Sequence, residues 1–411
     1  MPASVPAPNS ASALAQPQVG LSAPAPAPAL APASAKVEMK IARLGGSTLP
    51  TPDLSPSLSA GPSPAFSTVL QSPALSEFEL ENPFDRLADG QDASKEVGWT
   101  MPECWGHRGA SASFPENTRM SFIEACKAGA DGIETDIHMT ADNVLVMFHD
   151  PDLSRTTDSN GRIDKLPWHG VLEHVRTKKA PHQPIPKFTE VIEILLQLEN
   201  ANVKLNIDCK VENDPVRLFG LIKDVVEGYE GWESRLAPRL ILGIWHPKFI
   251  AAATTILPYL PRYAISMSIP QCRKYFFDAC HGFSIMYEVL ASSEGQRLLR
   301  DCRKHKKEIC AWTVNIREEM RECTRWGVKS VISDKPELWR ELKREIEADR
   351  ARALKPTIQT YVLPFIQKKN WWFEYQRLAR EETEYLEKEG GTFDIDVPEV
   401  EMRIARPADS L

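Results

Sequence analysis

The sequence predicts a single α/β domain, a (β/α)8 barrel flanked by two tails, on three observations. Eight short apolar runs typical of strands recur through the middle of the chain, and segments with helical spacing lie between most of them. This alternating part amounts to roughly 245 residues, the usual size of one such barrel. An Ala/Pro/Ser-rich stretch precedes it and a polar stretch follows it. An open sheet with helices on both faces is the alternative that fits the same alternation.

The N-terminal residues 1–95 are predicted to be a disordered tail. Residues 1–90 hold 15 of the 33 prolines, and the first 75 residues carry only five charged side chains. Such a tract buries too little apolar surface to offset the entropy of its chain. Proline also interrupts any apolar segment of a secretory signal and any amphipathic helix of a mitochondrial presequence.

Composition excludes two other classes of protein. A net charge of −7 and a pI near 5.8 argue against a protein that coats nucleic acid. No run of 18 apolar residues exists that would predict a membrane-spanning helix. All eight cysteines lie between Cys104 and Cys323 without a CxxC pair, which is typical of reduced thiols in an intracellular protein. We therefore expect a cytoplasmic protein, or one peripheral on an internal membrane of the endoplasmic reticulum, a lipid droplet or a mitochondrion.

The barrel strands and two of the helices are placed by apolar patterning. The strands are expected at residues 102–107, 131–138, 203–209, 239–244, 262–267, 283–287, 308–314 and 328–332. Helical spacing covers residues 118–128, with Asn117 as a candidate N-cap, and residues 189–198. Barrel residues 100–350 are thereby expected to form the folded domain.

A ninth strand, residues 144–149, does not fit the alternation. Only the short connection Thr140-Ala141-Asp142-Asn143 precedes it, which cannot hold a crossover helix, so it must be antiparallel to the second strand. We expect a hairpin that rises from the barrel mouth and returns His149 to its rim. Residues 150–187, which contain five prolines, are interpreted as an insertion that caps the mouth.

The end of the barrel is predicted from Ser333-Asp334-Lys335-Pro336. Asp334 can cap a helix that starts near Pro336, whose apolar face then closes the domain. Beyond it, residues 351–411 form the C-terminal tail. This tail contains a cluster of aromatic residues flanked by basic ones, a composition typical of a segment in a bilayer interface. The aromatic residues are Trp371, Trp372, Phe373 and Tyr375, and the basic ones are Lys368, Lys369 and Arg377. Docking of these aromatic side chains on the outside of the barrel is the alternative.

Polar residues gather where the first strands end. Glu134 and Asp136 share one face of the second strand, because residues i and i+2 point the same way, and so do Asp208 and Lys210 on the next. Three carboxylates that converge on one mouth repel each other unless a cation compensates. Hard oxygen ligands of this kind favour a divalent cation, Mg²⁺ or Ca²⁺, over zinc.

Basic residues surround this expected metal site. His107 and Arg108 end the first strand, His149 ends the hairpin, and Lys210 lies beside Asp208. A cation with an arginine and a lysine is suited to the charge that grows on a phosphodiester during cleavage. Two histidines supply a base for the incoming hydroxyl and an acid for the departing one, with Asp150 placed to orient His149. The pattern indicates phosphodiester hydrolysis.

These residues resemble the glycerophosphodiester phosphodiesterase family, whose members are metal-dependent barrels that hydrolyse glycerol-linked phosphodiesters. The resemblance covers about residues 101–340 and rests on six motifs in order. They are Gly106-His107-Arg108-Gly109, Pro115-Glu116-Asn117-Thr118, Gly132-Ile133-Glu134-Thr135-Asp136, Met147-Phe148-His149-Asp150, Ala311-Trp312-Thr313-Val314-Asn315 and Ile332-Ser333-Asp334. Each is weak alone, whereas their order and spacing together are specific.

The resemblance implies a role for each site residue. It implies metal binding by Glu134, Asp136 and Asp208, acid–base catalysis by His107 and His149, and phosphate contacts from Arg108 and Lys210. It also implies attack by the adjacent glycerol hydroxyl, giving a cyclic phosphate that water opens. Which histidine acts as the base is left open. Trp312 either packs against the substrate's glycerol or belongs to the core, and Glu116 and Asn117 are interpreted as structural.

One departure from the family pattern concerns the substrate. The family usually has glutamate where this chain has Asp208, and the aspartate occurs with Leu242-Gly243-Ile244-Trp245-His246 on the next strand. This combination is similar to a fungal branch that acts as a phospholipase C on phosphatidylglycerol. The resemblance thus implies a phospholipid substrate with peripheral membrane contact and no nucleic acid partner. A soluble glycerophosphodiester substrate and a catalytically inactive lipid-binding barrel are the alternatives.

Overall fold

The computed structural model describes residues 100–395, except for the side chains of residues 358–359 and 361–374. Eight parallel strands form a closed barrel, because β1 pairs with both β9 and β2. The barrel strands are β1 (Glu103–His107), β2 (Gly132–Met139), β4 (Lys204–Cys209), β5 (Leu240–Ile244), β6 (Arg262–Ser266), β7 (Gly282–Met286), β8 (Glu308–Trp312) and β9 (Ser330–Ser333). The predicted barrel is confirmed and the open sheet is excluded. The disordered tail predicted for residues 1–95 lies outside the described residues.

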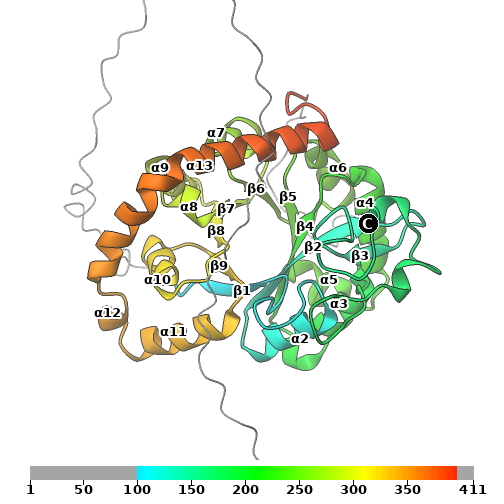
Figure 1. Cartoon of the computed structure of the whole chain (residues 1–411), viewed down its shortest axis with the longest axis horizontal. Coiled ribbons are helices and arrows are strands. Elements are labelled where there is room, and N and C mark those ends of the chain that lie inside the picture. Colours follow the sequence, from blue (N-terminus) through cyan, green and yellow to red (C-terminus); the bar gives the residue numbers. More distant parts are fainter. Residues whose placement is uncertain (1–99, 396–411) are drawn as a thin grey trace, which may run out of the picture. The chain divides into compact units, whose positions relative to one another are not determined.

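Helices surround the strands as a ring (Figure 1). They are α2 (Arg119–Lys127), α3 (Phe188–Leu195), α4 (Pro215–Glu227), α5 (Trp232–Arg235), α6 (Lys248–Ile256), α7 (Ile269–Gln271), α8 (Tyr287–Leu290), α9 (Ser293–Lys304), α10 (Arg317–Trp326), α11 (Pro336–Ala348), α12 (Arg350–Ala353) and α13 (Ile358–Gly390). Short turns of helix lie at Ile163–Lys165, Leu172–His174, Leu198–Asn200, Ala237–Arg239 and Cys272–Phe276. The two helices expected at residues 118–128 and 189–198 correspond to α2 and α3.

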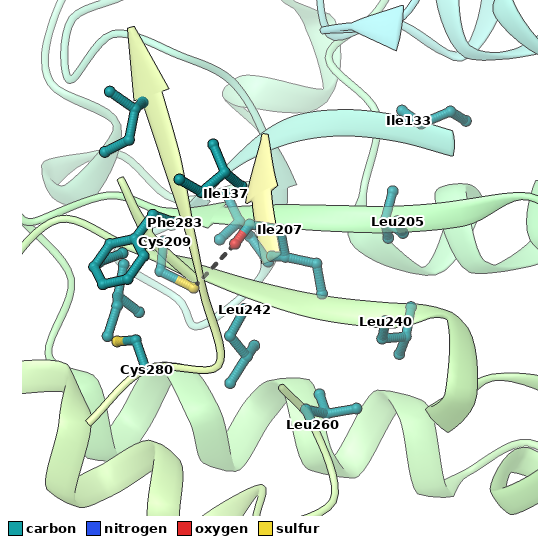
Figure 2. Packing of buried hydrophobic residues seen from close by; sticks show 14 of the residues in the cluster. Ile133, Ile137, Leu205, Ile207, Cys209, Leu240, Leu242, Leu260, Cys280 and Phe283 are labelled. Carbon is teal, nitrogen blue, oxygen red and sulfur yellow. Dashed lines mark hydrogen bonds between the residues drawn. The ribbon is translucent and has the colours of Figure 1, made fainter. Parts of the chain in front are cut away.

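The alternation along the strands separates an apolar layer beneath the helices from the side chains that face the barrel interior. Figure 2 shows the layer beneath the helices, to which β2, β4 and β5 contribute Ile133, Ile137, Leu205, Ile207, Leu240 and Leu242. The residues between them, including Glu134, Asp136 and Asp208, therefore point into the barrel. Trp105, Ile241, Tyr263, Cys310 and Ile332 form a second apolar cluster, drawn from β1, β5, β6, β8 and β9. Each acid is thereby held on a strand packed firmly from behind.

The hairpin and the insertion form a separate small core. β3 (Leu145–Met147) pairs antiparallel with β2, as expected. Val146 and Phe148 pack with buried side chains of the insertion, namely Leu153, Ile163, Trp168, Leu172, Val175 and Ile185. This core fixes the residue that follows Phe148, which is His149.

Two predicted helix caps are wrong. Thr118, not Asn117, caps α2 through a hydrogen bond from the Ser121 amide, and Asn117 has a left-handed backbone. Asp334 does not cap α11 either, because Lys335 occupies the cap position without a side-chain bond. Both side chains instead contact residues of the candidate site described below.

The C-terminal segment folds as α13, a helix of 33 residues. The bilayer-interface interpretation concerned Trp371, Trp372 and Phe373, whose side chains lie outside the described ones, as do those of Lys368 and Lys369. Of the described residues, Tyr375 packs partly buried against the main core, and Arg377 pairs with Glu381 at 2.7 Å. Among residues 100–395, no helix combines the length and apolar character needed to cross a membrane.

Candidate active site

Three carboxylates from two neighbouring strands meet at the mouth of the barrel. Glu134 and Asp136 come from β2 and Asp208 from β4, where Asp136 and Asp208 lie opposite each other in the register. One carboxylate oxygen from each residue lies within 4.8 Å of those of the other two, and all three residues are buried. The structure therefore brings together the three residues for which the sequence predicted metal binding.

The charge of this acidic triad is only partly compensated. The Lys210 ammonium lies 2.6 Å from Oδ1 of Asp136 and 2.8 Å from Oδ2 of Asp208. Burial and the neighbouring acids raise the pKa of Glu134 well above its ordinary value. Burial, together with Asp136, raises the pKa of Asp208 to about 6, although Lys210 opposes the shift. Burial also disfavours ionised Asp136, but Lys210, His149 and Arg108 hold its pKa well below normal.

A divalent cation would supply the positive charge that the acidic triad lacks. The raised pKa values mean that Glu134 and Asp208 bind a proton more readily than ordinary carboxylates, although Lys210 lies nearby. Too little positive charge surrounds them to stabilise their ionised forms. Carboxylate oxygens are the ligands that Mg²⁺ and Ca²⁺ prefer. Glu134, Asp136 and Asp208 are therefore the residues that would hold the ion.

Two further side chains fix the positions of the acids. Nδ2 of Asn117 donates a 2.6 Å hydrogen bond to Oδ2 of Asp136, and Nε1 of Trp245 donates a 2.8 Å bond to Oδ1 of Asp208. The left-handed backbone of Asn117, at φ 52°, accompanies this orientation. The structural interpretation of Asn117 therefore extends to orienting a residue of the triad.

Arg108 follows β1 and faces the same acids. Its backbone amide donates to Oε2 of Glu134 at 3.1 Å, and its Nε lies 3.4 Å from Oδ2 of Asp136. Glu116 accepts a 2.9 Å bond from the Arg108 guanidinium and is also bonded by Arg155 of the insertion. The guanidinium is thus held between Glu116 and the triad.

His107 borders the triad on the β1 side. Its Nε2 lies 4.0 Å from Oε2 of Glu134, and its Nδ1 donates a 2.6 Å hydrogen bond to Oδ1 of Asp334. Burial of Asp334 opposes its ionisation, but the bond from His107 helps to lower its pKa to about 2. Ser111 and Asn315 also donate to this carboxylate. Asp334 therefore stays ionised and orients the imidazole.

His149 approaches from the hairpin. Its Nδ1 donates a 2.6 Å hydrogen bond to Oδ1 of Asp150, which Arg155 also contacts, so the expected orienting role of Asp150 agrees with the geometry. Burial and the nearby Lys210 lower the pKa of His149 to about 4. Its imidazole is therefore neutral at pH 7. The Phe148 amide donates to the Asp136 carbonyl at 3.0 Å, which brings the next residue, His149, to the end of β2 that carries the triad.

His138 lies on β2, two residues after Asp136. It is buried, and its Nε2 lies 3.2 Å from the carbonyl oxygen of His149. The reason is that the insertion folds over the end of β2, where residue i+2 from Asp136 points inward. His138 thereby supports the backbone of the hairpin at His149.

Trp312 ends β8 on the opposite side of the mouth. Its ring lies 5.8 Å from that of Trp245 in an edge-on arrangement. Its Nε1 is buried and has no hydrogen-bond partner within the described part of the chain. A ring at this place has a free donor for a polar ligand as well as an apolar face.

All eight predicted site residues thus surround one mouth, and two more residues that the sequence analysis did not place there complete it. Asp334 was interpreted as a helix cap, although closure of the barrel pairs Gly106 with Ser333 and so sets it beside His107. Trp245 lies at the C-terminal end of β5, the position where barrel sites lie. Strand ends were the signal that could have identified both.

Comparison with known proteins agrees with this site. Residues 107–338 match the model of the Glycerophosphoryl diester phosphodiesterase family. The chain belongs to this family. It is thereby a phosphoric diester hydrolase of a metal-dependent family, as the motifs at the strand ends implied.

Relatives and solved structures cover the same part of the chain. The glycerophosphodiester phosphodiesterase of Bacillus altitudinis is 23% identical over 251 residues, which are 60% of this chain and 100% of the relative. The enzyme of that name from Caldanaerobacter subterraneus is 24% identical and is covered to 96% by 58% of this chain. An Oleispira antarctica phosphodiesterase, solved with the product sn-glycerol-3-phosphate, has a TM-score of 0.51 at 24% identity, covering 60% of this chain and 97% of that one. This structural likeness supports the barrel fold.

Proposed function

We propose that this protein hydrolyses glycerol-linked phosphodiesters at the mouth of the barrel. The observation that carries the proposal is the pair of histidines, each with its Nδ1 bonded to a carboxylate, on either side of the acidic triad. Such a pair leaves each Nε2 free to move a proton at a reacting oxygen. When bound, a divalent cation would supply positive charge that stabilises the charge developing on the phosphate oxygens.

The electrostatics favour one assignment of the two histidines. His149 is neutral at pH 7, since its pKa is about 4, and is therefore the base that removes the proton from the attacking glycerol hydroxyl. His107, whose Nδ1 is held by Asp334 at 2.6 Å, is then left as the group that protonates the departing alcohol. The glycerol oxygen forms a bond to phosphorus while the bond to that alcohol breaks, which leaves a cyclic phosphate. Water then opens the ring with the two roles exchanged.

Arg108 and Lys210 are placed to bind the phosphate. Lys210 is buried and its ammonium bridges Asp136 and Asp208, whereas Arg108 is partly exposed and lies beside Asp136. Neighbouring acids keep the pKa of Lys210 raised although burial opposes this, so it stays charged. Trp312, with its free indole donor and apolar face, supports binding of the glycerol part.

For the substrate, we infer phosphatidylglycerol, cleaved to diacylglycerol and glycerol phosphate. The support comes from the two features that resemble the fungal phospholipase C branch, Asp208 and the segment 242–246. In the structure these features form one arrangement, because Trp245 of that segment donates to Oδ1 of Asp208. The aspartate is one methylene shorter than the usual glutamate, and the indole holds it in place. Soluble glycerophosphodiesters, the class named for the curated relatives, are the second candidate substrate.

A comparison of two substrates tests this proposal. Purified protein with Mg²⁺ or Ca²⁺ is supplied with phosphatidylglycerol vesicles and, separately, with glycerophosphocholine. We expect release of diacylglycerol and glycerol phosphate from the vesicles, measured by chromatography of the lipid and aqueous phases. Cleavage of glycerophosphocholine alone would reject the lipid substrate and keep the diesterase activity. Cleavage of neither substrate would contradict the proposed function.

A further inference from the structure

Helix α13 runs along the rim at which the strands end, outside the part of the chain that matches the family. The family match ends at residue 338, whereas α13 begins at Ile358. Figure 1 shows the helix arching past α9, α8 and α7 toward α6. Gln271 of α7 donates to Thr383 at 2.9 Å, and Nε2 of His246, which follows β5, lies 3.0 Å from the carbonyl oxygen of Gly391. These contacts place the last turns of α13 at the mouth.

One face of these turns is directed toward the barrel. Leu386 is buried in the main core, and the Tyr385 hydroxyl donates to the carboxylate of Glu212, two residues after Lys210. Glu382 precedes Leu386 by four residues and Tyr385 by three, so it lies on the same face. Its pKa is raised by burial and by Asp208 and Glu212, with Lys210 opposing the shift. Geometry and electrostatics thus agree that Glu382 faces the catalytic mouth.

The Glu382 carboxylate lacks a compensating charge there. No hydrogen bond or ion pair joins it to any residue of the described part of the chain. Lys210, the cation that affects it most, is already held by Asp136 and Asp208. The negative charges of the three triad carboxylates and of a singly charged diester would be balanced by a bound divalent cation, Lys210 and Arg108. The negative charge of Glu382 is therefore uncompensated, and it can interact with the part of the substrate that lies beneath α13.

We propose that Glu382 is a specificity-determining residue that faces the alcohol esterified to the phosphate and selects alcohols with an ammonium group or hydroxyl donors over anionic ones. The inference rests on the proposed diesterase function and deepens it. A carboxylate accepts hydrogen bonds from a polyol and attracts a cation, and it repels a second anionic group. In soluble glycerophosphodiesters the selected alcohol is the departing one, for example ethanolamine, which brings an ammonium group, or a second glycerol, which brings hydroxyl donors.

The test compares Glu382→Gln, Glu382→Ala and the control Glu384→Gln on three soluble diesters. Glu384 is an exposed glutamate on the same helix, so its variant makes the same charge change away from the mouth. The substrates are glycerophosphoglycerol, glycerophosphoethanolamine and glycerophosphoserine, which differ in the charge of their alcohol. We expect kcat/KM for the ethanolamine diester relative to the serine diester to fall about tenfold in both Glu382 variants, mainly through KM.

The glycerol diester distinguishes the two kinds of recognition. Because glutamine keeps an acceptor oxygen, Glu382→Gln should retain the wild-type KM for glycerophosphoglycerol, whereas Glu382→Ala should raise it. The inference would be overturned if the ratio of kcat/KM for the ethanolamine diester to that for the serine diester were the same in both Glu382 variants as in Glu384→Gln. A loss of Mg²⁺ or Ca²⁺ affinity in Glu382→Gln, measured by calorimetry, would also overturn it, since Glu382 would then belong to the metal site. A wild-type protein that cleaves no diester would reject the proposed function as well.

Discussion

Replacement of His149 by alanine is expected to lower turnover by about 10²–10⁴-fold, the usual contribution of a general base. The imidazole is neutral at pH 7 and lies beside the acidic triad, with its Nδ1 occupied by Asp150. Its side chain is about one-third exposed, so its removal leaves no large cavity in the core. Steady-state rates with saturating Mg²⁺ or Ca²⁺, together with thermal unfolding of both proteins, measure the effect.

A histidine of the insertion, His174, provides the control for that variant. His174 is largely exposed and pairs only loosely with Glu173, so His174→Ala should retain the wild-type rate. Retention of more than about a tenth of the rate by His149→Ala would contradict its assignment as a proton-transfer group.

The largest effect on metal-dependent activity is expected from Asp136→Asn, which should lower turnover by about 10³-fold or more. Asparagine keeps the shape, but its amide nitrogen cannot accept a hydrogen bond as the replaced oxygen does from Asn117 or Lys210, and it removes the triad charge that Lys210 and Arg108 keep ionised. Loss of this charge weakens the binding of the cation. It also weakens the positioning of Lys210, since the Lys210 ammonium lies 2.6 Å from Asp136. Rates measured over a range of metal concentrations test the prediction.

Asp224→Asn, on the exposed face of α4, makes the same change far from the mouth and should be neutral. If Asp136→Asn keeps the wild-type rate and metal dependence, Asp136 does not hold the ion.

The fold was predictable because its signals are local. Each barrel strand is an apolar run bounded by turns, and the observed strands differ from the expected ones by a few residues at most, as at β8, which ends at Trp312 instead of residue 314. The acids could be placed by the same argument, because i and i+2 on a strand share a face.

What the sequence did not predict depends on contacts distant in the chain. Asp334 looks like a helix cap locally, and only the pairing of β9 with β1 sets it against His107. His138 is buried because the insertion builds a core of its own, which follows no short-range pattern. Glu382 lies some 170 residues beyond Asp208, and only the path of α13 along the rim relates the two.

Removal and return of the metal tests the central claim most directly, namely that the carboxylates of Glu134, Asp136 and Asp208 hold a divalent cation required for diester cleavage. The chain is treated with a chelator, freed of it by gel filtration, and assayed before and after addition of Mg²⁺ or Ca²⁺. We predict no turnover by the treated protein, recovery on addition of the ion, and no recovery in Asp136→Asn. Full turnover by the metal-free protein would contradict the account.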